Sequence, residues 1–325
     1  MKIEKIYVYP VKALQPVELP AAEATRDGFT FDRRFMLVKI LPDGLKNIHV
    51  AKFPESVLFY PTIRPTRDDT AVDELTITYK APNSPETSLT FPLTPVTDGL
   101  DTVDVVMHKA PTRGYDMGPE CNDWFSECYG FPVKLLYLGD NRRNILMSTK
   151  TSGGAKQTWS SWVSGVIAGG IKDEITFADC APYLVVSRTS LHNVSSRLSG
   201  GLEMDVTKFR PNIVVEGASQ AWEEDYWGKL ALGGIRLDLV HNCVRCKSIN
   251  IDYRTGKPGE DEHGEVLKKL QSDRRVDNGA KWSPVFGRYS CMSQDSEETV
   301  IKVGDEVQVL ERNAQRTVFD WPGLG

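Results

Sequence analysis

Two cysteines with C-x-x-C spacing, Cys243 and Cys246, are the residues of this chain whose types and spacing most directly indicate chemistry. Arg245 lies between them, and a turn signal at Thr255 and Gly256 follows downstream. Thiolates are the softest ligands that a protein can offer a metal, and a neighbouring guanidinium favours the reactive thiolate form of a cysteine. The pattern therefore indicates either a soft metal ligand or a reactive thiol.

Three functional interpretations of this C-x-x-C pattern stay open, beside the alternative of two buried core thiols. A structural zinc site needs a second ligand pair, and the sequence holds no other C-x-x-C. A thioredoxin-like redox pair needs a helix after the cysteines, whereas we expect residues 247–252 to continue as a strand. The third interpretation is that one thiolate holds the metal of a cofactor and the other cysteine is structural.

Several cations and one carboxylate lie at the ends of expected strands, where the loops of a β-barrel converge. Lys12 follows the strand expected over residues 3–8, and Arg34 directly precedes the one expected over residues 35–38. Arg210 and Asn212 lie at the start of the strand expected over residues 212–215. An arginine and an amide at a strand entrance can bind an anion through charge-assisted hydrogen bonds, although this motif alone favours a surface arginine beside a proline turn. Asp179 precedes an apolar strand and is either a turn-forming residue or a carboxylate at the barrel mouth.

Other common signatures are absent from the sequence. It contains neither a phosphate-binding G-x-x-x-x-G-K-[ST] loop nor a G-x-G-x-x-G after a strand, and it has no G-x-S-x-G elbow. None of its five histidines pairs at metal-ligand spacing. The net charge of −5 gives no global support for binding nucleic acid.

Length and composition are those of an ordinary globular protein. The 325 residues suffice for two domains or one large β-rich domain, and 40% apolar with 26% charged residues is typical. The six cysteines are sparse and irregularly spaced, unlike a disulfide scaffold. The sequence begins with an alternating pattern instead of a signal peptide, and no apolar run reaches the roughly 20 residues of a membrane span. We expect a soluble cytoplasmic protein with reduced thiols.

Short strands separated by turn signals dominate the sequence, which favours a barrel or sandwich that is mainly β with a few helices. Pro119 is expected to begin a helix that Gly130 ends, and Thr189 to begin another that ends at Gly200. Gly304 and Asp305 are expected to form the tight turn of a hairpin between residues 299–303 and 306–310. Further strands are expected over residues 3–8, 35–38, 75–79, 183–186, 212–215 and 235–240.

A Gly/Ser-rich stretch over residues 139–173 has the character of a long loop or linker. We therefore expect an N-terminal β-barrel domain over residues 1–140 and a second β-barrel domain over residues 141–325. Residues 317–323 are apolar for a terminus, and we expect them to pack on the body of the protein in preference to binding a partner.

Taken in order, these pieces resemble the MOSC proteins, and within them the mitochondrial amidoxime-reducing components with their N-terminal β-barrel domain. The resemblance covers nearly the whole chain, from Ile3 to about Leu310. No single motif is specific, whereas the ordered set is. Its members are residues 9–12, 32–35, 209–212, 244–246, 252, 255–256, 283–287 and 303–305.

The resemblance implies a molybdenum cofactor, which is a pterin dithiolene with a terminal phosphate. Cys246 matches the family's molybdenum-ligating cysteine, and Asp179 matches a carboxylate facing the open side of the metal, as proton donor or substrate anchor. The sequence departs from relatives at Ala13, Cys180, Ala181 and Val244, where hydroxyl residues are common. The implied cofactor-binding residues are Lys12, Arg34, Arg210, Asn212 and Arg245, of which Arg245 either hydrogen-bonds the cofactor or orients Cys246.

The implied activity is reduction of N-hydroxylated compounds, such as amidoximes and hydroxylamines, by a molybdenum-dependent oxidoreductase. Because the sequence has no evident haem, flavin or nicotinamide motif, electrons must come from another protein, and the resemblance implies cytochrome b5 and NADH-cytochrome b5 reductase as the donors. The alternatives are a sulfur-transfer MOSC protein and a cofactor carrier without turnover. Animal relatives carry an N-terminal membrane anchor that this sequence does not show, so mitochondrial association is expected only as an alternative to a cytoplasmic location.

Overall fold

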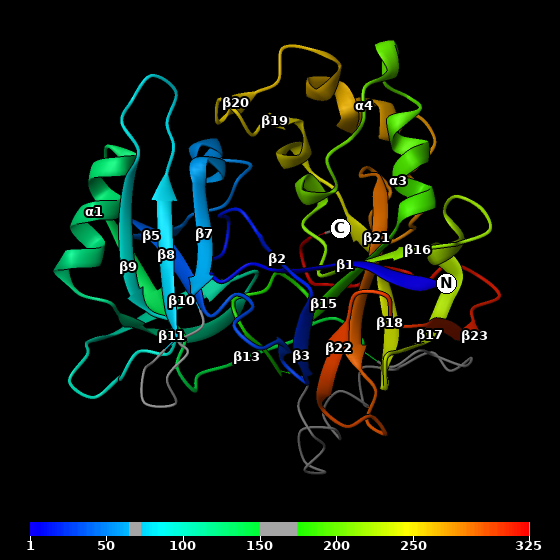
Figure 1. Cartoon of the computed structure of the whole chain (residues 1–325), viewed down its shortest axis with the longest axis horizontal. Helices are drawn as coiled ribbons and strands as arrows, with labels where there is room; N and C mark the ends of the chain where they lie inside the picture. The colour runs from blue at the N-terminus through cyan, green and yellow to red at the C-terminus, as the bar shows by residue number, and fades with distance from the viewer. Residues whose placement is uncertain (65–72, 150–173, 325) are drawn as a thin grey trace.

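The computed structural model describes residues 1–64, 73–149 and 174–324. Strands are the most common regular element in the described part of the chain, and they form two groups of sheets lying side by side (Figure 1). The expected class, mainly β with a few helices, is confirmed. Residues 150–173 of the expected linker lie outside the described residues.

The largest sheet has eight strands and lies in the group at the right of Figure 1. A bridge between Lys2 and Glu306, together with the hydrogen bond from the Val307 amide to the Met1 carbonyl (2.9 Å), brings its two ends together into a nearly closed barrel. In spatial order its strands are β2 (Val17–Leu19), β1 (Lys2–Val8), β16 (Ile213–Glu216), β15 (Tyr183–Ser187), β21 (Val285–Met292), β18 (Ile235–Val244), β17 (Trp227–Leu232) and β23 (Val307–Arg312).

The second group contains a five-stranded and a three-stranded sheet around a core rich in aromatic side chains. The Asn47 amide donates to the Val106 carbonyl (2.8 Å), which links the two outer strands of the five-stranded sheet. The five strands are β10 (Thr102–Met107), β11 (Ala110–Asp116), β12 (Val133–Tyr137), β5 (Phe35–Leu41) and β6 (Gly44–Asn47). The three-stranded sheet consists of β7 (Phe59–Arg64), β8 (Glu74–Tyr79) and β9 (Thr87–Pro92).

The remaining elements are short. One small sheet has the order β22 (Thr299–Lys302), β3 (Ala21–Thr25) and β4 (Gly28–Phe29). Two further sheets have two strands each: β13 (Arg143–Asn144) with β14 (Glu174–Ile175), and β19 (Ile251–Asp252) with β20 (Lys257–Pro258). The described α-helices are α1 (Pro119–Tyr129), α3 (Arg188–Ser195) and α4 (Val266–Gln271). The 3-10 helices are η1 (Pro54–Leu58), η2 (Ser199–Gly201), η3 (Val206–Phe209), η4 (Glu223–Tyr226), η5 (Lys247–Asn250) and η6 (Glu262–Glu265).

Two local expectations are corrected by the structure, and one is confirmed. The expected hairpin around Gly304 is wrong, because β22 pairs with β3 and β23 pairs with β17. Helix α3 ends at Ser195, before the expected end at Gly200. Helix α1 follows the expectation, since it begins at Pro119 and ends where Gly130 takes a left-handed φ of 71°.

The N-terminal segment joins the sheets of the C-terminal half. Strand β1 pairs antiparallel with β16, and β3 pairs antiparallel with β22. Residues 1–25 therefore contribute to the sheets of the second half, while residues 35–137 form the sheets of the first. We propose the division near residue 140 as the division of the chain into domains, with this exchange of strands across it.

A buried carboxyl group in η4 makes the stability of the protein depend on pH. Burial raises the pKa of Glu224 from its ordinary 4.5 to about 7, although Ser190 donates a hydrogen bond to it (2.7 Å). Because the folded pKa is the higher one, this group favours folding fully below pH 4.5, and the advantage is lost as the pH rises through 7. We expect Glu224→Gln to raise the free energy of unfolding at pH 8 by on the order of 3 kcal/mol, measured by urea unfolding.

The neighbouring carboxyl group provides a control of opposite sign. Burial opposes ionisation of Glu223, but hydrogen bonds from Ser219 and Arg312 outweigh it and lower its pKa to about 2. Glu223→Gln should therefore destabilise the protein at neutral pH. Equal pH dependence of unfolding in wild type and Glu224→Gln between pH 4.5 and 8 would contradict the assignment.

Candidate functional site

Cys246 lies just beyond the end of β18, at a point where the strand leaves the sheet. The pairing of β18 with β21 shifts register between Asn242 and Val244, and such a bulge redirects the residues that follow. On the opposite strand Gly287 has a φ of 82°, and a Cβ there would lie 2.7 Å from Val186 Cγ1. The irregular pairing brings Cys246 to the surface, where its thiol is exposed and lies 3.3 Å from the Ser248 hydroxyl.

The residues after Cys246 differ from the expectation. Residues 247–252 were expected to continue as a strand, but η5 follows Cys246 directly and only residues 251–252 are extended. The reason is local: the Ile249 amide donates to the Cys246 carbonyl (3.4 Å), which closes a turn. One short turn therefore holds Cys246 at the surface, whereas Cys243 is buried within the sheet.

Arg245 is buried and donates hydrogen bonds to two backbone segments next to Cys246. Its Nε and Nη2 donate to the Phe286 carbonyl (2.9 and 2.6 Å), and its Nη1 donates to the Phe209 carbonyl (2.7 Å). The sequence left open whether Arg245 contacts a cofactor or orients Cys246. These contacts are those of an orienting residue, and they place Cys246 beside the segment that carries Arg210.

Two guanidinium groups lie against the ring of the buried Tyr9. The Cζ atoms of Arg33 and Arg210 are 4.7 and 4.3 Å from the ring centroid. Arg210 donates to the Leu14 carbonyl (2.8 Å), and its Nη2 is buried without a hydrogen-bond partner among the described residues. Arg33 is paired with Asp32. The cluster thus holds two cations for one carboxylate, and an unused donor, which suits an anionic group.

Asn212 fixes this cluster to the sheet. Its Oδ1 accepts from Arg33 Nη1 (3.1 Å) and from the Leu184 amide (3.2 Å), and its Nδ2 donates to the Tyr7 carbonyl (3.2 Å). Asn212 is fully buried. It therefore holds the Arg33 guanidinium and links β1 and β15 at this point.

Arg34, which was expected to take part in the site, lies apart from this cluster. Its guanidinium donates to the Gly139 carbonyl and packs over the Tyr137 ring at 5.9 Å. The adjacent Arg33 joins Arg210 and Asn212 instead. Arg33 lies in the turn before β5 with a left-handed φ of 50°, and a pair of adjacent arginines does not reveal from sequence which one such a turn directs to the site.

Lys12 and Asp179 come together although 167 residues separate them, and His108 joins them. Lys12 is buried, forms an ion pair with Asp179 and donates to the Phe177 carbonyl (3.1 Å). His108 Nε2 lies 3.1 Å from Asp179 Oδ1. His108 was not selected from the sequence, and only its position in the two-residue turn between β10 and β11 could have drawn attention to it.

Asp179 is held ionised by these two partners. Burial would raise its pKa, but the charge of Lys12 and then the hydrogen bond and charge of His108 outweigh burial and bring the pKa well below the ordinary value. The Asp179 side chain remains about half exposed (54%). At neutral pH it is therefore a carboxylate available to a ligand, and it can accept hydrogen bonds.

Two further thiols lie behind the site. Cys180 and Cys243 are buried, and burial raises the pKa of both. A buried thiol with a raised pKa stays protonated, which makes it a poor nucleophile and a poor ligand. Cys246 is thus the accessible thiol of the C-x-x-C pattern.

No group of three or more His, Cys, Asp or Glu side chains is arranged to hold a metal ion within residues 1–64, 73–149 and 174–324. The described site offers a metal one accessible thiolate, beside a cationic cluster and an ionised carboxylate. This donor set suits a metal that already carries other soft ligands.

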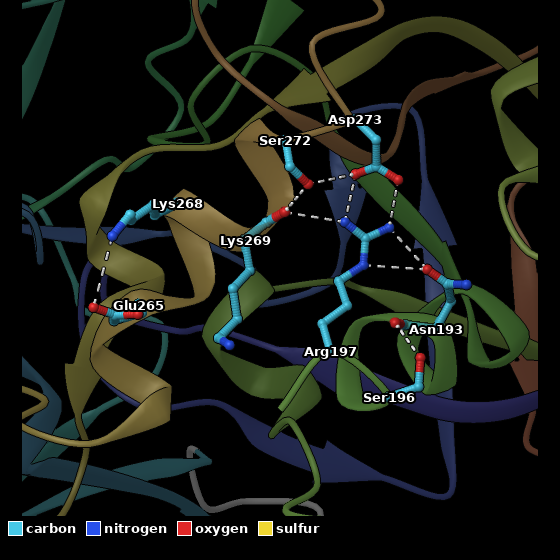
Figure 2. A pocket seen from close by; sticks show the side chains of 8 residues that line it. All are labelled: Asn193, Ser196, Arg197, Glu265, Lys268, Lys269, Ser272 and Asp273. Carbon is cyan, nitrogen blue, oxygen red and sulfur yellow. Dashed lines mark hydrogen bonds and ion pairs between the residues drawn. The ribbon is translucent and has the colours of Figure 1, made fainter. Parts of the chain in front are cut away.

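A surface pocket between α3 and α4 is separate from these residues (Figure 2). Arg197 lies at its centre and is held by both carboxylate oxygens of Asp273 (2.5 and 2.9 Å) and by Asn193 (2.9 Å). Since this arginine is already neutralised, the pocket presents little free charge to a ligand, and it contains no residue of the site described above.

Comparison with known protein families shows the family to which the chain belongs. The family model of the MOSC N-terminal beta barrel domain matches residues 1–132, and that of the MOSC domain matches residues 172–308. The chain therefore belongs to the MOSC domain proteins. It is similar along nearly its whole length to mitochondrial amidoxime-reducing component 1 of Mus musculus, with 27% identity over 317 residues, which is 95% of this chain and 82% of the relative.

Other relatives carry related names. The human mitochondrial amidoxime-reducing component 1 is 27% identical over 318 residues, covering 95% of this chain and 82% of the relative. A molybdenum cofactor sulfurase of Oryza sativa subsp. japonica is 26% identical over 320 residues, covering 94% of this chain and 35% of the relative. The family is thus related to the molybdenum cofactor. Among the described residues, no helix is both long and apolar enough to cross a membrane.

Proposed function

We propose that this protein is a molybdenum cofactor-dependent reductase of N-hydroxylated compounds such as amidoximes and hydroxylamines. The proposal is carried by two links: Arg245, next to the exposed thiol of Cys246, donates to the Phe209 carbonyl beside Arg210, and Arg33 of the cationic cluster interacts with the ionised Asp179. The names of the relatives support the same activity.

The residues present fit the molybdenum cofactor. Cys246 would provide the protein thiolate to the metal, and Arg210, with its unused buried donor, would bind the anionic pterin phosphate together with Arg33. Lys12, beside Asp179, would contact the polar edge of the pterin. When bound, the cofactor would supply the centre for two-electron reduction, which the amino-acid side chains themselves cannot provide.

Asp179 serves in this proposal as the substrate anchor and not as the acid. Its lowered pKa leaves it without a proton at neutral pH. A carboxylate accepts hydrogen bonds from the N–H and O–H groups of an amidoxime, and it pairs with the cationic amidine that forms. The reduction consumes two electrons and two protons and releases the oxygen as water, so the protons would come from solvent at the exposed side of Asp179.

Electrons would come from a separate protein, and we propose cytochrome b5 with NADH-cytochrome b5 reductase as the donors. The direct test is to prepare the protein in a host that makes the cofactor, measure molybdenum and the fluorescent oxidised pterin, and follow benzamidoxime reduction with these donors. Bound molybdenum with turnover is expected. Absence of both metal and pterin would overturn the proposal.

Two arginine variants test the anion site in the same preparation. Arg210→Ala should lower cofactor affinity roughly 10-fold or more, because it removes charge-assisted hydrogen bonds, while Arg34→Ala should retain the cofactor. Thermal unfolding checks that both variants are folded. Loss of pterin in Arg34→Ala alone would support the assignment made from sequence and contradict the one made from the structure.

A second candidate is a sulfur-transfer or cofactor-carrier role, which the similarity to the rice molybdenum cofactor sulfurase favours. Cys246 would then carry a persulfide, since it is the exposed thiol of the pair. Intact mass spectrometry distinguishes the two: an added mass of about 32 Da, the mass of one sulfur atom, on Cys246 without bound metal would favour sulfur transfer. Bound cofactor without benzamidoxime turnover would favour the carrier.

A further inference from the structure

The C-terminal tail, residues 317–324, packs against the site although it lies beyond the matched MOSC segment, which ends at residue 308. Phe319 and Trp321 are buried, as expected for a tail that packs on the body of the protein. The Phe319 amide donates to Asp277 (2.9 Å), and Asp320 lies 3.2 Å from His241 Nε2. These contacts hold the tail directly before Trp321.

Trp321 contacts His108, which pairs with the Asp179 carboxylate. Its Nε1 donates to the His108 carbonyl (2.8 Å), and the two rings meet edge to face with centroids 6.3 Å apart. His108 and Lys109 form a two-residue hairpin turn with φ values of 49° and 68°. That turn conformation is unfavourable for residues other than glycine, asparagine and aspartate, so the contact with Trp321 helps to hold it.

The same indole contacts a second support of Asp179. The Arg143 guanidinium lies 5.5 Å from the Trp321 ring centroid and donates to the carbonyls of Ala178 and Asp179. Arg143 is buried. Trp321 therefore touches two of the groups that fix Asp179: His108 at the carboxylate and Arg143 at the backbone.

We propose that the C-terminal tail is part of the functional site, in which Trp321 is a positioning residue that holds His108 against the Asp179 carboxylate. Without the indole, the hairpin turn would no longer be tied to the tail. His108 would then spend less time within hydrogen-bond distance of Asp179, and the carboxylate would lose part of its stabilisation. The proposal deepens the proposed function, on which the catalytic part of its test rests.

The charged environment of Asp179 defines the measurement. Besides His108, the groups that face Asp179 or act on it are Lys12, Arg33, His49, Arg143, Cys180, Cys243 and Tyr289. Trp321→Phe keeps an aromatic ring beside Arg143, so a shift in the pKa of Asp179 in this variant reports on the lost Nε1 donor to the turn that carries His108. The pKa of Asp179 can be followed by carbon-13 NMR of the full-length protein labelled on aspartate, with Asp179→Asn to assign the signal.

The expected results follow from the order of the contacts. His108→Gln should raise the pKa of Asp179, because it removes one of the partners that lower this pKa, and Trp321→Phe, which keeps an aromatic ring but loses the Nε1 donor, should raise it by less. The acid limb of the pH profile of benzamidoxime reduction should move to higher pH in both variants. Val318→Thr, which alters a half-exposed side chain of the same tail, should match wild type in both measurements.

The outcomes separate this inference from the proposed function. A wild-type pKa of Asp179 in Trp321→Phe, with a shifted pKa in His108→Gln, would overturn the positioning role of Trp321. A wild-type value in both variants would overturn the role of His108 as well. If the pKa shifts occur but no variant, wild type included, reduces benzamidoxime, the positioning stands and the proposed function fails.

Discussion

Cys246→Ala is expected to abolish molybdenum binding and turnover while leaving the fold intact. Because second-sphere substitutions at metal sites typically cost 10–100-fold in affinity, loss of the protein ligand itself should cost roughly 100-fold or more. The side chain is exposed, so the free energy of unfolding should change by less than about 0.5 kcal/mol. Metal analysis, benzamidoxime reduction and urea unfolding of the same preparation measure the three effects.

Cys243→Ala is the matched control for this prediction, since the two thiols share one motif and differ in burial. Cys243 is 3% exposed and packs in an apolar cluster, so its truncation should cost about 1 kcal/mol of stability and retain molybdenum. Full molybdenum content in Cys246→Ala, or loss of metal in Cys243→Ala alone, would show that the ligand has been assigned to the wrong cysteine.

Arg274→Ala should produce the largest loss of stability among the variants considered. The side chain is 3% exposed, donates to both carboxylate oxygens of Asp225 (2.8 and 2.9 Å) and lies 3.9 Å from the centroid of the Trp222 ring. Removal of one partner leaves a buried charge with less compensation, which costs about 3–5 kcal/mol. The midpoint of urea unfolding should fall accordingly, with an unchanged slope.

Arg316→Ala provides the control, because Arg316 binds the same carboxylate from a more exposed position. Its Nε donates to Asp225 Oδ2 at 2.7 Å, and its side chain is 30% exposed. A partly exposed pair of this kind should contribute no more than about 1 kcal/mol. Equal destabilisation by the two variants would mean that burial does not determine the strength of this network.

Local patterns in the sequence were sufficient for the fold class and for several elements. Alternating apolar residues marked β1 and β8, and the proline and glycine signals marked both ends of α1. The hairpin around Gly304 failed for a physical reason: a turn signal fixes the reversal of the chain, whereas the partners of each strand depend on distant residues. Strands β22 and β23 find better partners in β3 and β17.

The sequence also predicted the candidate site only in part, because contacts between distant residues cannot be read from local patterns. Sequence motifs selected Lys12, Asp179 and Arg210, and the structure brings all three into the groups described above. His108 escaped selection because its partner is 71 positions away and its own turn has no chemical signature. Arg33 was passed over in favour of Arg34, since the face taken by each side chain depends on the backbone path. The role of each residue as a ligand-binding group remains a prediction.

The pairing of β1 with β16 has a consequence for the synthesis of this protein. Lys2 pairs with Glu216. Strand β1 therefore leaves the ribosome first, and its partner β16 is synthesised more than 200 positions later. At about 5–20 residues per second, the delay is roughly 10–40 s. During this time β2 can cover one edge of β1, but the other edge stays open to wrong partners. Nascent chains of this protein should therefore depend on chaperones until about residue 216 has emerged.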